Sequence, residues 1–276
     1  MLRNLSFIAL LGIAAVGVPS ELSAKSVKVA STQKGAAAKS ITRQVAQQNV
    51  TIEFYSPSIV RILKSDAGVG APVQKKSYSV ILKPQQMKGI QIQEKGDFVN
   101  IKSSFISVEL NQQTGEIRFL SKDGKLLLTD TKTRLEARKD EANKGKYRIE
   151  QDFRLADDEA IYGLGQLRDV YMNQRGRQNI ELWNHNTYIA IPYFTSEKGY
   201  GLYWDNAGKT YFNDVVASRN NSNQPSCTSF TSEVGTCADY YFMYNDVKPL
   251  RIRKPVHFFE GHWFIVVWAH MEDFHV

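Results

Sequence analysis

The stretch that decides the fold class spans residues 98–129 and reads FVNIKSSFISVELNQQTGEIRFLSKDGKLLLT. It contains four short runs of strand character, at 98–101, 105–110, 116–120 and 126–129. Turn residues separate the last three runs, Gln113-Thr114-Gly115 first and then Asp123-Gly124. An Asp-Gly pair between two such runs is typical of a tight hairpin, because glycine accepts the left-handed backbone that the turn requires. The stretch therefore predicts consecutive antiparallel strands.

The same pattern continues on both sides of this stretch. Further strand patterns lie at 50–54, 59–63, 78–82, 90–93, 146–155, 189–195, 201–204, 210–215, 228–234 and 239–244. No segment combines a sustained helical apolar period with caps at both ends. An apolar content of 42% argues against a disordered chain,. Short strands at a spacing of about 8–12 residues predict an all-β fold, an antiparallel β-sandwich over residues 48–245.

The N-terminus has the features of a secretory signal peptide. Arg3 precedes an apolar run over residues 5–18, and a run of this length is too short for a membrane-spanning helix. We expect residues 1–24 to be removed by cleavage after Ala24; cleavage after Ser20 and an uncleaved membrane anchor are the alternatives. The mature protein would then be periplasmic or secreted, with no later membrane-spanning segment.

The net charge of +7 does not point to nucleic acid. Part of it lies in residues 25–47, which are rich in Ala, Ser, Lys and Gln and are predicted to form a flexible spacer,. The other Lys and Arg residues are scattered among the strand patterns instead of being collected on one face. Solubility explains this distribution better than nucleic-acid binding does.

The two cysteines, Cys227 and Cys237, admit two interpretations. In the oxidising compartment that the leader implies, they would form a disulfide that closes a short loop between two strand patterns. Two buried free thiols are the alternative. No histidine lies beside either cysteine, which argues against a zinc site.

Polar and glycine-containing segments follow residue 157. Asp157-Asp158-Glu159 is interpreted as an acidic turn and not as a catalytic carboxylate group. In residues 161–165, IYGLG, the two glycines resemble a nucleotide-binding motif, but Arg168 occupies the third glycine position and no helical pattern follows. We interpret the glycines as a strand edge where the backbone makes a close approach.

Residues 173–187 combine amides, two guanidinium groups, an indole and an imidazole. Planar groups with several donors grip the hydroxyl pairs of a sugar, and an aromatic face suits the C–H surface of the ring. This composition therefore indicates a sugar-binding loop. The alternative is a polar hairpin whose side chains satisfy its own backbone.

Motifs within and after this segment carry a resemblance to a known family. They are, in order, residues 162–166 (YGLGQ), 175–176 (RG), 182–184 (LWN), 191–194 (IPYF) and 199–206 (GYGLYWDN). Together they resemble the N-terminal domain of family 31 glycoside hydrolases, the α-glucosidase and α-xylosidase group. Residues 239–244 are similar to the point where that domain joins the catalytic barrel. The resemblance covers about residues 48–245 and implies a sandwich similar to galactose mutarotases.

The resemblance also implies that a hairpin loop lines the substrate pocket. The matching substrate-binding candidates are Trp183, Asn184, His185 and Asn186. Family members commonly carry an aspartate where this chain has Asn186, so that contact would differ. The implied ligand is an α-linked glucoside or xyloside. Neither cofactor nor metal is implied, because retaining glycosidases use two carboxylates and water.

In that family both catalytic carboxylates lie on the barrel that follows the sandwich. Residues 268–272 read WAHME and lack the aspartate of the nucleophile block, and the residues after Tyr244 are too few for a barrel of about 250 residues. We assign no catalytic residue and expect the chain to be inactive alone. Residues 246–276 hold four of the five histidines; we interpret them as a frameshift or truncation remnant, with a histidine metal site as the alternative.

Other functions remain open at this point. A stand-alone carbohydrate-binding module is the main alternative. A mutarotase-type epimerase would need a histidine and carboxylate pair, and His185 is the only histidine between residues 48 and 245. Nucleic-acid binding rests on net charge alone.

Overall fold

The computed structural model describes residues 40–84, 89–167, 171–186, 188–220 and 225–244. The expected signal peptide and the tail at 246–276 lie outside these residues. The described residues form strands together with two 3₁₀ helices, η1 (Ala67–Val69) and η2 (Glu141–Asn143), and one short α-helix, α1 (Ala217–Asn220). Within the described part of the chain, no helix has the length and apolar character of a membrane span.

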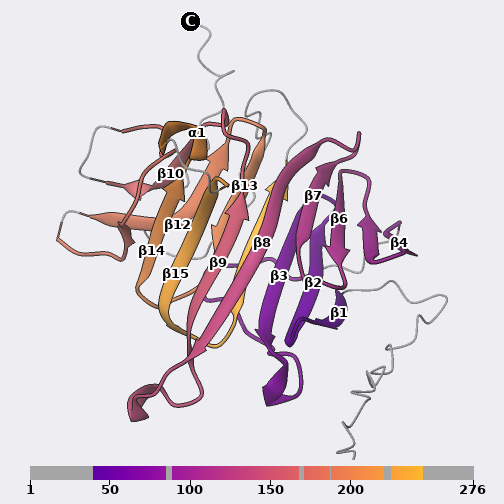
Figure 1. The fold of residues 1–276 in the computed structure, drawn as a ribbon, viewed down its shortest axis with the longest axis horizontal. Helices are drawn as coiled ribbons and strands as arrows, with labels where there is room; N and C mark the ends of the chain where they lie inside the picture. The colour runs from indigo at the N-terminus through magenta and orange to yellow at the C-terminus, as the bar shows by residue number, and fades with distance from the viewer. Residues whose placement is uncertain (1–39, 85–88, 168–170, 187, 221–224, 245–276) are drawn as a thin grey trace, which may run out of the picture. The chain divides into compact units, whose positions relative to one another are not determined.

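Two antiparallel sheets make up the fold (Figure 1). The seven-stranded sheet contains, in spatial order, β1 (Ser40–Val45), β2 (Gln48–Ser56), β3 (Ile59–Asp66), β16 (Ala238–Tyr244), β13 (Tyr200–Trp204), β12 (Ile189–Ser196) and β10 (Ile161–Gln166). The nine-stranded sheet contains β11 (Ile180–Leu182), β14 (Thr210–Val215), β15 (Cys227–Gly235), β9 (Tyr147–Arg154), β8 (Leu126–Ala137), β7 (Ile117–Ser121), β6 (Ile106–Asn111), β5 (Phe98–Lys102) and β4 (Gln91–Lys95). The prediction of an antiparallel, all-β fold is confirmed.

The stretch at 98–129 forms the consecutive hairpins that its pattern predicts. It becomes β5, β6, β7 and the start of β8, each paired with the next. Gly115 and Gly124 have φ angles of 77° and 79° in the two later turns, a conformation that favours glycine. The Gly124 N–H donates to the Ser121 carbonyl over 2.9 Å and closes the second turn.

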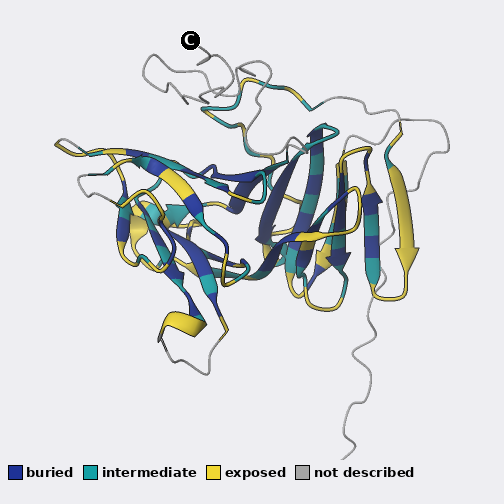
Figure 2. Cartoon of the chain, turned by 90° about the horizontal axis from the view of Figure 1, so that it is seen from above, coloured by how far each residue is buried: buried dark blue, intermediate teal, exposed yellow. Residues whose placement is uncertain are grey.

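One apolar core fills the space between the sheets. Phe119 of β7 stacks on Phe242 of β16 with ring centroids 4.3 Å apart. Trp204 of β13 stacks in the same way on Phe230 of β15, at 5.6 Å. Figure 2 shows buried positions along the strands of both sheets, whereas the edge strand β4 is exposed throughout. These contacts join strands of the two sheets and make the fold a sandwich.

Two local expectations are wrong. Residues 40–45, which the composition assigns to the spacer, form β1, because Val45 is buried and Ile41 packs against the core. Residues 78–82 form no named strand. The Ser77 hydroxyl accepts the backbone N–H groups of Ser79 and Val80, and such local bonds turn the backbone away from an extended path.

The predicted disulfide is also wrong, because both cysteines are free thiols. Cys227 is the first residue of β15 and Cys237 lies two positions past its last residue, Gly235, so eight residue steps of extended strand lead away from Cys227 before the chain turns towards Cys237. At the rise of an extended strand these steps span roughly 27 Å, whereas a disulfide needs Cα atoms within about 7 Å. Burial raises the pKa of each thiol to about 11. The alternative of two free thiols is the one that the structure supports.

Candidate functional site

The loop between β11 and β12 carries all four substrate-binding candidates. Because β11 belongs to the nine-stranded sheet and β12 to the seven-stranded sheet, this loop connects the two layers. The Tyr188 N–H donates to the His185 carbonyl over 2.9 Å and closes a turn. Asn186 lies within that turn with a φ of 50°, a conformation that asparagine tolerates better than most residues. The turn therefore gives the candidate residues a defined position.

Trp183, Asn184, His185 and Asn186 are all exposed. Some of their polar groups serve the loop itself: Asn184 Oδ1 accepts the Ala190 N–H over 2.7 Å, and the Trp183 indole donates to the Glu181 carboxylate over 2.6 Å. In the part of the chain that the structure describes, the Asn184 amide nitrogen and the Asn186 side chain bond to nothing. The described part of the loop therefore leaves these two groups unused.

The aromatic rings of the loop are held by contacts with one another and with Lys209. The Lys209 ammonium lies 4.3 Å from the centroid of the Trp183 ring, and the His185 ring lies 5.0 Å from the same ring. His185 in turn stacks on Tyr188 at 5.1 Å. A cation–π contact at an exposed site is worth about 0.5–1 kcal/mol. Trp183 and His185 therefore stiffen the loop, although the Trp183 side chain keeps 41% of its surface exposed.

The two glycines of β10 bring its backbone against β12. A Cβ atom on Gly163 would lie 2.7 Å from the Tyr193 carbonyl oxygen, and one on Gly165 would lie 2.0 Å from that of Ile189. β10 is the last strand of the seven-stranded sheet, and its register with β12 shifts between these glycines. The predicted strand edge with a close backbone approach is confirmed, and it supports the start of β12 directly after the loop.

Several polar residues of the 157–177 region serve the fold and not a ligand. Gln174 and Arg175 are buried, and the Arg175 Nε lies 3.2 Å from the equally buried Asp214 carboxylate. Glu159 is buried and accepts the hydroxyls of Ser196 and Tyr200, each over 2.5 Å. Residues 157–159 form a turn, as predicted, because the Glu159 N–H donates to the Ala156 carbonyl. Gln174 and Arg175, which lie in the segment predicted to bind sugar, are buried in the fold.

A cleft of about 400 Å³ lies beside the loop. It is lined by three segments, at 78–79, 182–192 and 203–209, and the side chains with aromatic or polar groups there are Tyr78, Ser79, Trp183, Asn184, Tyr203, Asp205, Asn206 and Lys209. The sequence analysis missed Tyr78 and Lys209 and quoted Asp205-Asn206 only as part of a motif. No local signal joins these positions, because their proximity arises from the packing of the strands.

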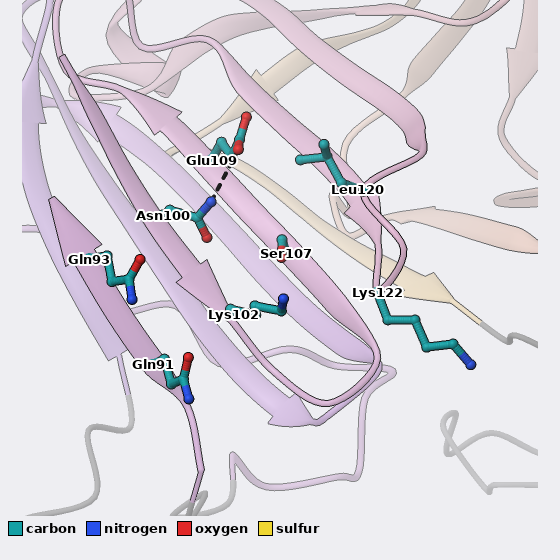
Figure 3. Close-up of a pocket in the computed structure, with 9 residues that line it drawn as sticks. Gln91, Gln93, Asn100, Lys102, Ser107, Glu109, Leu120 and Lys122 are labelled. Carbon is teal, nitrogen blue, oxygen red and sulfur yellow. Dashed lines mark hydrogen bonds between the residues drawn. The ribbon is translucent and has the colours of Figure 1, made fainter. Parts of the chain in front are cut away.

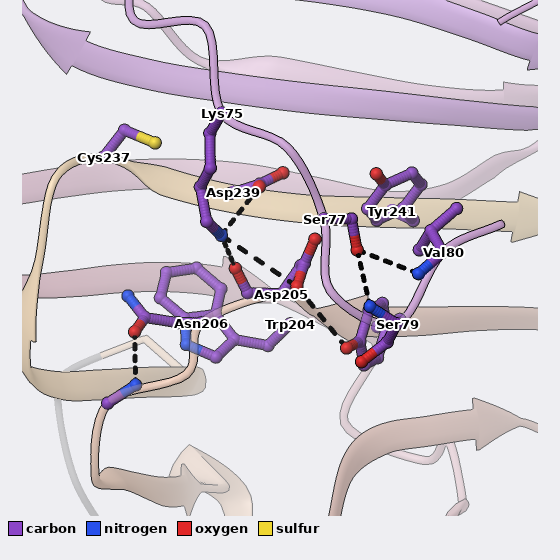
Figure 4. A network of polar contacts seen from close by, with 12 residues as sticks. Lys75, Ser77, Ser79, Val80, Trp204, Asp205, Asn206, Cys237, Asp239 and Tyr241 are labelled. Atoms are coloured by element: carbon purple, nitrogen blue, oxygen red, sulfur yellow. Dashed lines mark hydrogen bonds and ion pairs between the residues drawn. The ribbon is translucent and has the colours of Figure 1, made fainter. Parts of the chain in front are cut away.

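A charged network includes Asp205 of this cleft, and Figure 4 draws part of it. Arg61 donates to both carboxylate oxygens of Asp239, over 2.8 and 2.7 Å. The Lys75 ammonium lies 2.9 Å from Asp239 and also donates to the Asp205 carbonyl. The network anchors the segment around Lys75 to the seven-stranded sheet and positions Asp205 at the edge of the cleft.

Asp205 is the unsatisfied member of this region. Its Oδ1 accepts the Tyr203 hydroxyl at 3.5 Å and lies 3.9 Å from Lys75, while its buried Oδ2 makes no hydrogen bond of ordinary geometry among the described residues. Burial raises the pKa of the Asp205 carboxyl and Asp239 raises it further, whereas Lys75, a hydrogen bond with the Ser77 side chain and Arg61 lower it, with a net rise. Among the same residues, no group of three or more His, Cys, Asp and Glu side chains is placed to hold a metal.

Comparison with known proteins decides the family. A family model described as "Glycosyl hydrolase 31 N-terminal galactose mutarotase-like domain" matches residues 49–213. The chain belongs to glycoside hydrolase family 31. A family 31 relative, the alpha-xylosidase of Saccharolobus solfataricus, is 29% identical over 212 residues, which are 74% of this chain and 27% of that protein. Alpha-xylosidase A of Aspergillus niger is 38% identical over 60 residues, 22% of this chain and 8% of its own length.

Solved family 31 structures share the sandwich. The alpha-xylosidase from Xanthomonas citri superposes with a TM-score of 0.64 at 18% identity and covers 76% of this chain and 38% of its own. The Flavobacterium johnsoniae dextranase complexed with isomaltotriose gives 0.59 at 24%, with 77% of this chain and 26% of its own. The predicted galactose mutarotase-like fold is confirmed. The chain spans well under two thirds of the length of these relatives.

Proposed function

We propose that this sandwich is the N-terminal domain of an α-glycosidase acting on α-linked xylosides or glucosides. Family membership supports the reaction class. Two relatives in sequence are named alpha-xylosidases, and a family 31 alpha-xylosidase from a soil metagenome, complexed with xylose, has the same fold with a TM-score of 0.63. The two catalytic carboxylates of a retaining glycosidase would belong to another part of the complete enzyme.

Within that enzyme, the loop at 183–186 is proposed to line the substrate pocket. The observation that carries this role is the state of the loop: a closed turn and stacked rings hold it, while the Asn184 amide nitrogen and the Asn186 amide stay exposed without partners among the described residues. Rigid placement lowers the entropy that a ligand contact would cost. The amides would bind sugar hydroxyls, and the rings would keep them in place.

The test is hydrolysis of nitrophenyl α-xyloside and α-glucoside by the complete enzyme that carries this sandwich. Asn186→Gly removes the amide and keeps the backbone unstrained, because Asn186 has a φ of 50°,. Loss of one ligand hydrogen bond should lower kcat/KM about three- to tenfold.

Asn179→Gly is the matched control, since Asn179 is also exposed, has a φ of 57° and lies at the far end of β11. Equal kcat/KM values for the two variants would contradict the proposal that the loop lines the substrate pocket. Failure of the complete enzyme to hydrolyse either glycoside would overturn the proposed reaction.

Export to the periplasm or medium is proposed as well, supported by the basic and apolar composition of residues 1–24,. N-terminal sequencing of protein recovered from the periplasm or medium should begin at Lys25. An intact N-terminus on protein found only with the cytoplasmic fraction would contradict it.

A further inference from the structure

Two hollows on the sandwich differ in the groups that they offer. One is a groove of about 250 Å³ over β4 to β7, drawn in Figure 3. Its walls carry amides and charged groups, including Gln91, Gln93 and Lys102, and the Asn100 amide donates to Glu109 over 3.1 Å. No aromatic side chain lines it. Polar groups without an aromatic face give a sugar ring little apolar surface to stack on.

The other hollow is the cleft of about 400 Å³ beside the loop. We propose that this cleft binds a pyranose ring of the glycoside chain, with the Tyr78 ring as its stacking face. The inference deepens the proposed function and rests on it for the class of ligand. A volume of this size is within the range of small-molecule sites, about 300–1,000 Å³.

The stacking surface comes from Tyr78. Its side chain is 81% exposed, the highest value among the large apolar and aromatic residues of the described chain. Trp183 stands on the loop side of the cleft, where Lys209 already contacts its ring. An exposed tyrosine that lines a cleft is a surface on which the C–H face of a sugar can be buried without displacing a protein contact.

Both hydrogen-bond donors and hydrogen-bond acceptors line the cleft together with the Tyr78 ring. The Asn184 amide nitrogen and the Lys209 ammonium can donate to hydroxyl oxygens. Asp205 supplies a carboxylate at the cleft wall; its Oδ2 makes no hydrogen bond of ordinary geometry among the described residues, although the Ser77 side chain interacts with the carboxyl group. A buried acceptor without a donor is costly, and a small shift of its side chain towards a sugar hydroxyl would satisfy it. Such mixed donors and acceptors beside an aromatic ring match the chemistry of a pyranose.

The segment that carries Tyr78 is held firmly. Arg61 Nη2 donates to the Lys75 carbonyl over 2.8 Å, and the Lys75 side chain reaches Asp239. Val80, two residues beyond Tyr78, packs against the aromatic cluster on the outer face of the seven-stranded sheet. Tyr78 therefore projects from a segment that is fixed on both sides, which reduces the entropy lost on binding.

The experiment is a ligand-observed NMR titration of the full chain with methyl α-xyloside, methyl α-glucoside and isomaltotriose. Tyr78→Ala should weaken binding about tenfold, because burial of one ring face against the sugar contributes a factor of about ten to the affinity. Lys209→Met, which keeps the stem and removes the ammonium, should weaken it as well. Circular dichroism checks that both variants keep the β fold.

The matched control is Tyr171→Ala, which removes another exposed tyrosine, 63% exposed and not among the residues of the cleft. Gln93→Ala tests the groove of Figure 3 in the same way. Unchanged affinity in both controls and a loss in Tyr78→Ala supports the proposal. No saturable binding in the millimolar range, or equal affinity in wild type and Tyr78→Ala, overturns it.

These outcomes can be separated from those of the proposed function. If the complete enzyme loses activity on Asn186→Gly while the chain binds no sugar, only the cleft site fails. If the complete enzyme hydrolyses neither glycoside, the proposed function fails first, and binding of methyl glycosides in the cleft is then the property of a carbohydrate-binding sandwich.

Discussion

Replacing Asp239 by asparagine should strongly destabilise the sandwich. The Asp239 carboxylate accepts Arg61 Nε at 2.8 Å, Arg61 Nη2 at 2.7 Å and Lys75 Nζ at 2.9 Å. Its side chain is fully buried, and that of Arg61 is only 6% exposed. An asparagine would retain the shape but present an amide nitrogen to these donors. The buried guanidinium would then keep only the more distant Glu53 carboxylate, 3.9 Å away, and would lose the close charge that compensates its desolvation.

Removal of one partner from a buried ion pair costs about 3–5 kcal/mol. The assay is equilibrium unfolding of the full chain in urea, followed by far-ultraviolet circular dichroism. With an m-value of about 2 kcal/mol/M, the midpoint should fall by roughly 2 M for Asp239→Asn. The m-value itself should stay constant, because the surface exposed on unfolding is the same.

Glu94→Gln provides the matched control. Arg43 Nη2 lies 2.7 Å from the Glu94 carboxylate, the same distance as between Arg61 and Asp239, but the Glu94 side chain is 53% exposed. Exposed pairs contribute about 0.2–1 kcal/mol. If Asp239→Asn and Glu94→Gln shift the midpoint equally, burial of the pair has no energetic consequence and the reasoning is refuted.

Three further outcomes are expected in the same unfolding assay. Gly165→Ala should cost more than the control Gly124→Ala, since both have a positive φ but only Gly165 would place its Cβ 2.0 Å from the Ile189 carbonyl oxygen; equal losses would contradict the close approach. Phe230→Ala should cost about 3–5 kcal/mol because the ring is fully buried,, and a loss below about 1 kcal/mol would contradict the packing. The raised pKa of Asp205 means that the contribution of this residue to stability falls as pH rises from the ordinary aspartate pKa through the raised one,. The free energy of unfolding of Asp205→Asn minus that of wild type should therefore be larger at neutral pH than at acidic pH. A difference that does not change with pH would refute this.

Much of the fold could be predicted from local patterns. Alternation over residues 98–129, with Gly115 and Gly124 in the turns, predicts β5 to β8, because side chains of a strand alternate between its faces,. The glycines of β10 were also interpreted correctly as a strand edge with a close backbone approach. Errors arose where local chemistry was ambiguous: Ser77 turns the backbone at residues 78–82, and residues 40–45 become a strand only by pairing with β2.

The candidate site, like the fold, could be predicted from the sequence only in part. Sequence motifs placed Trp183 to Asn186 on a polar hairpin and related it to family 31. They could not tell which polar side chains are buried and paired with other residues of the fold. In the sequence Arg175 looks like a ligand-binding group and Glu159 like part of an acidic turn, and both are buried in the structure. Their partners come from other strands, at Asp214 and Tyr200.

The sequence by itself determined most of the strands, their turns and the resemblance to family 31, because these depend on contacts between near neighbours and on motifs read in order. Only the tertiary structure decided that β11 and β12 lie in different sheets, so that the loop spans the two layers. It also brought Tyr78, Trp183 and Lys209 to one cleft. Such proximity depends on how two sheets pack their apolar faces together, and that packing joins residues more than a hundred positions apart.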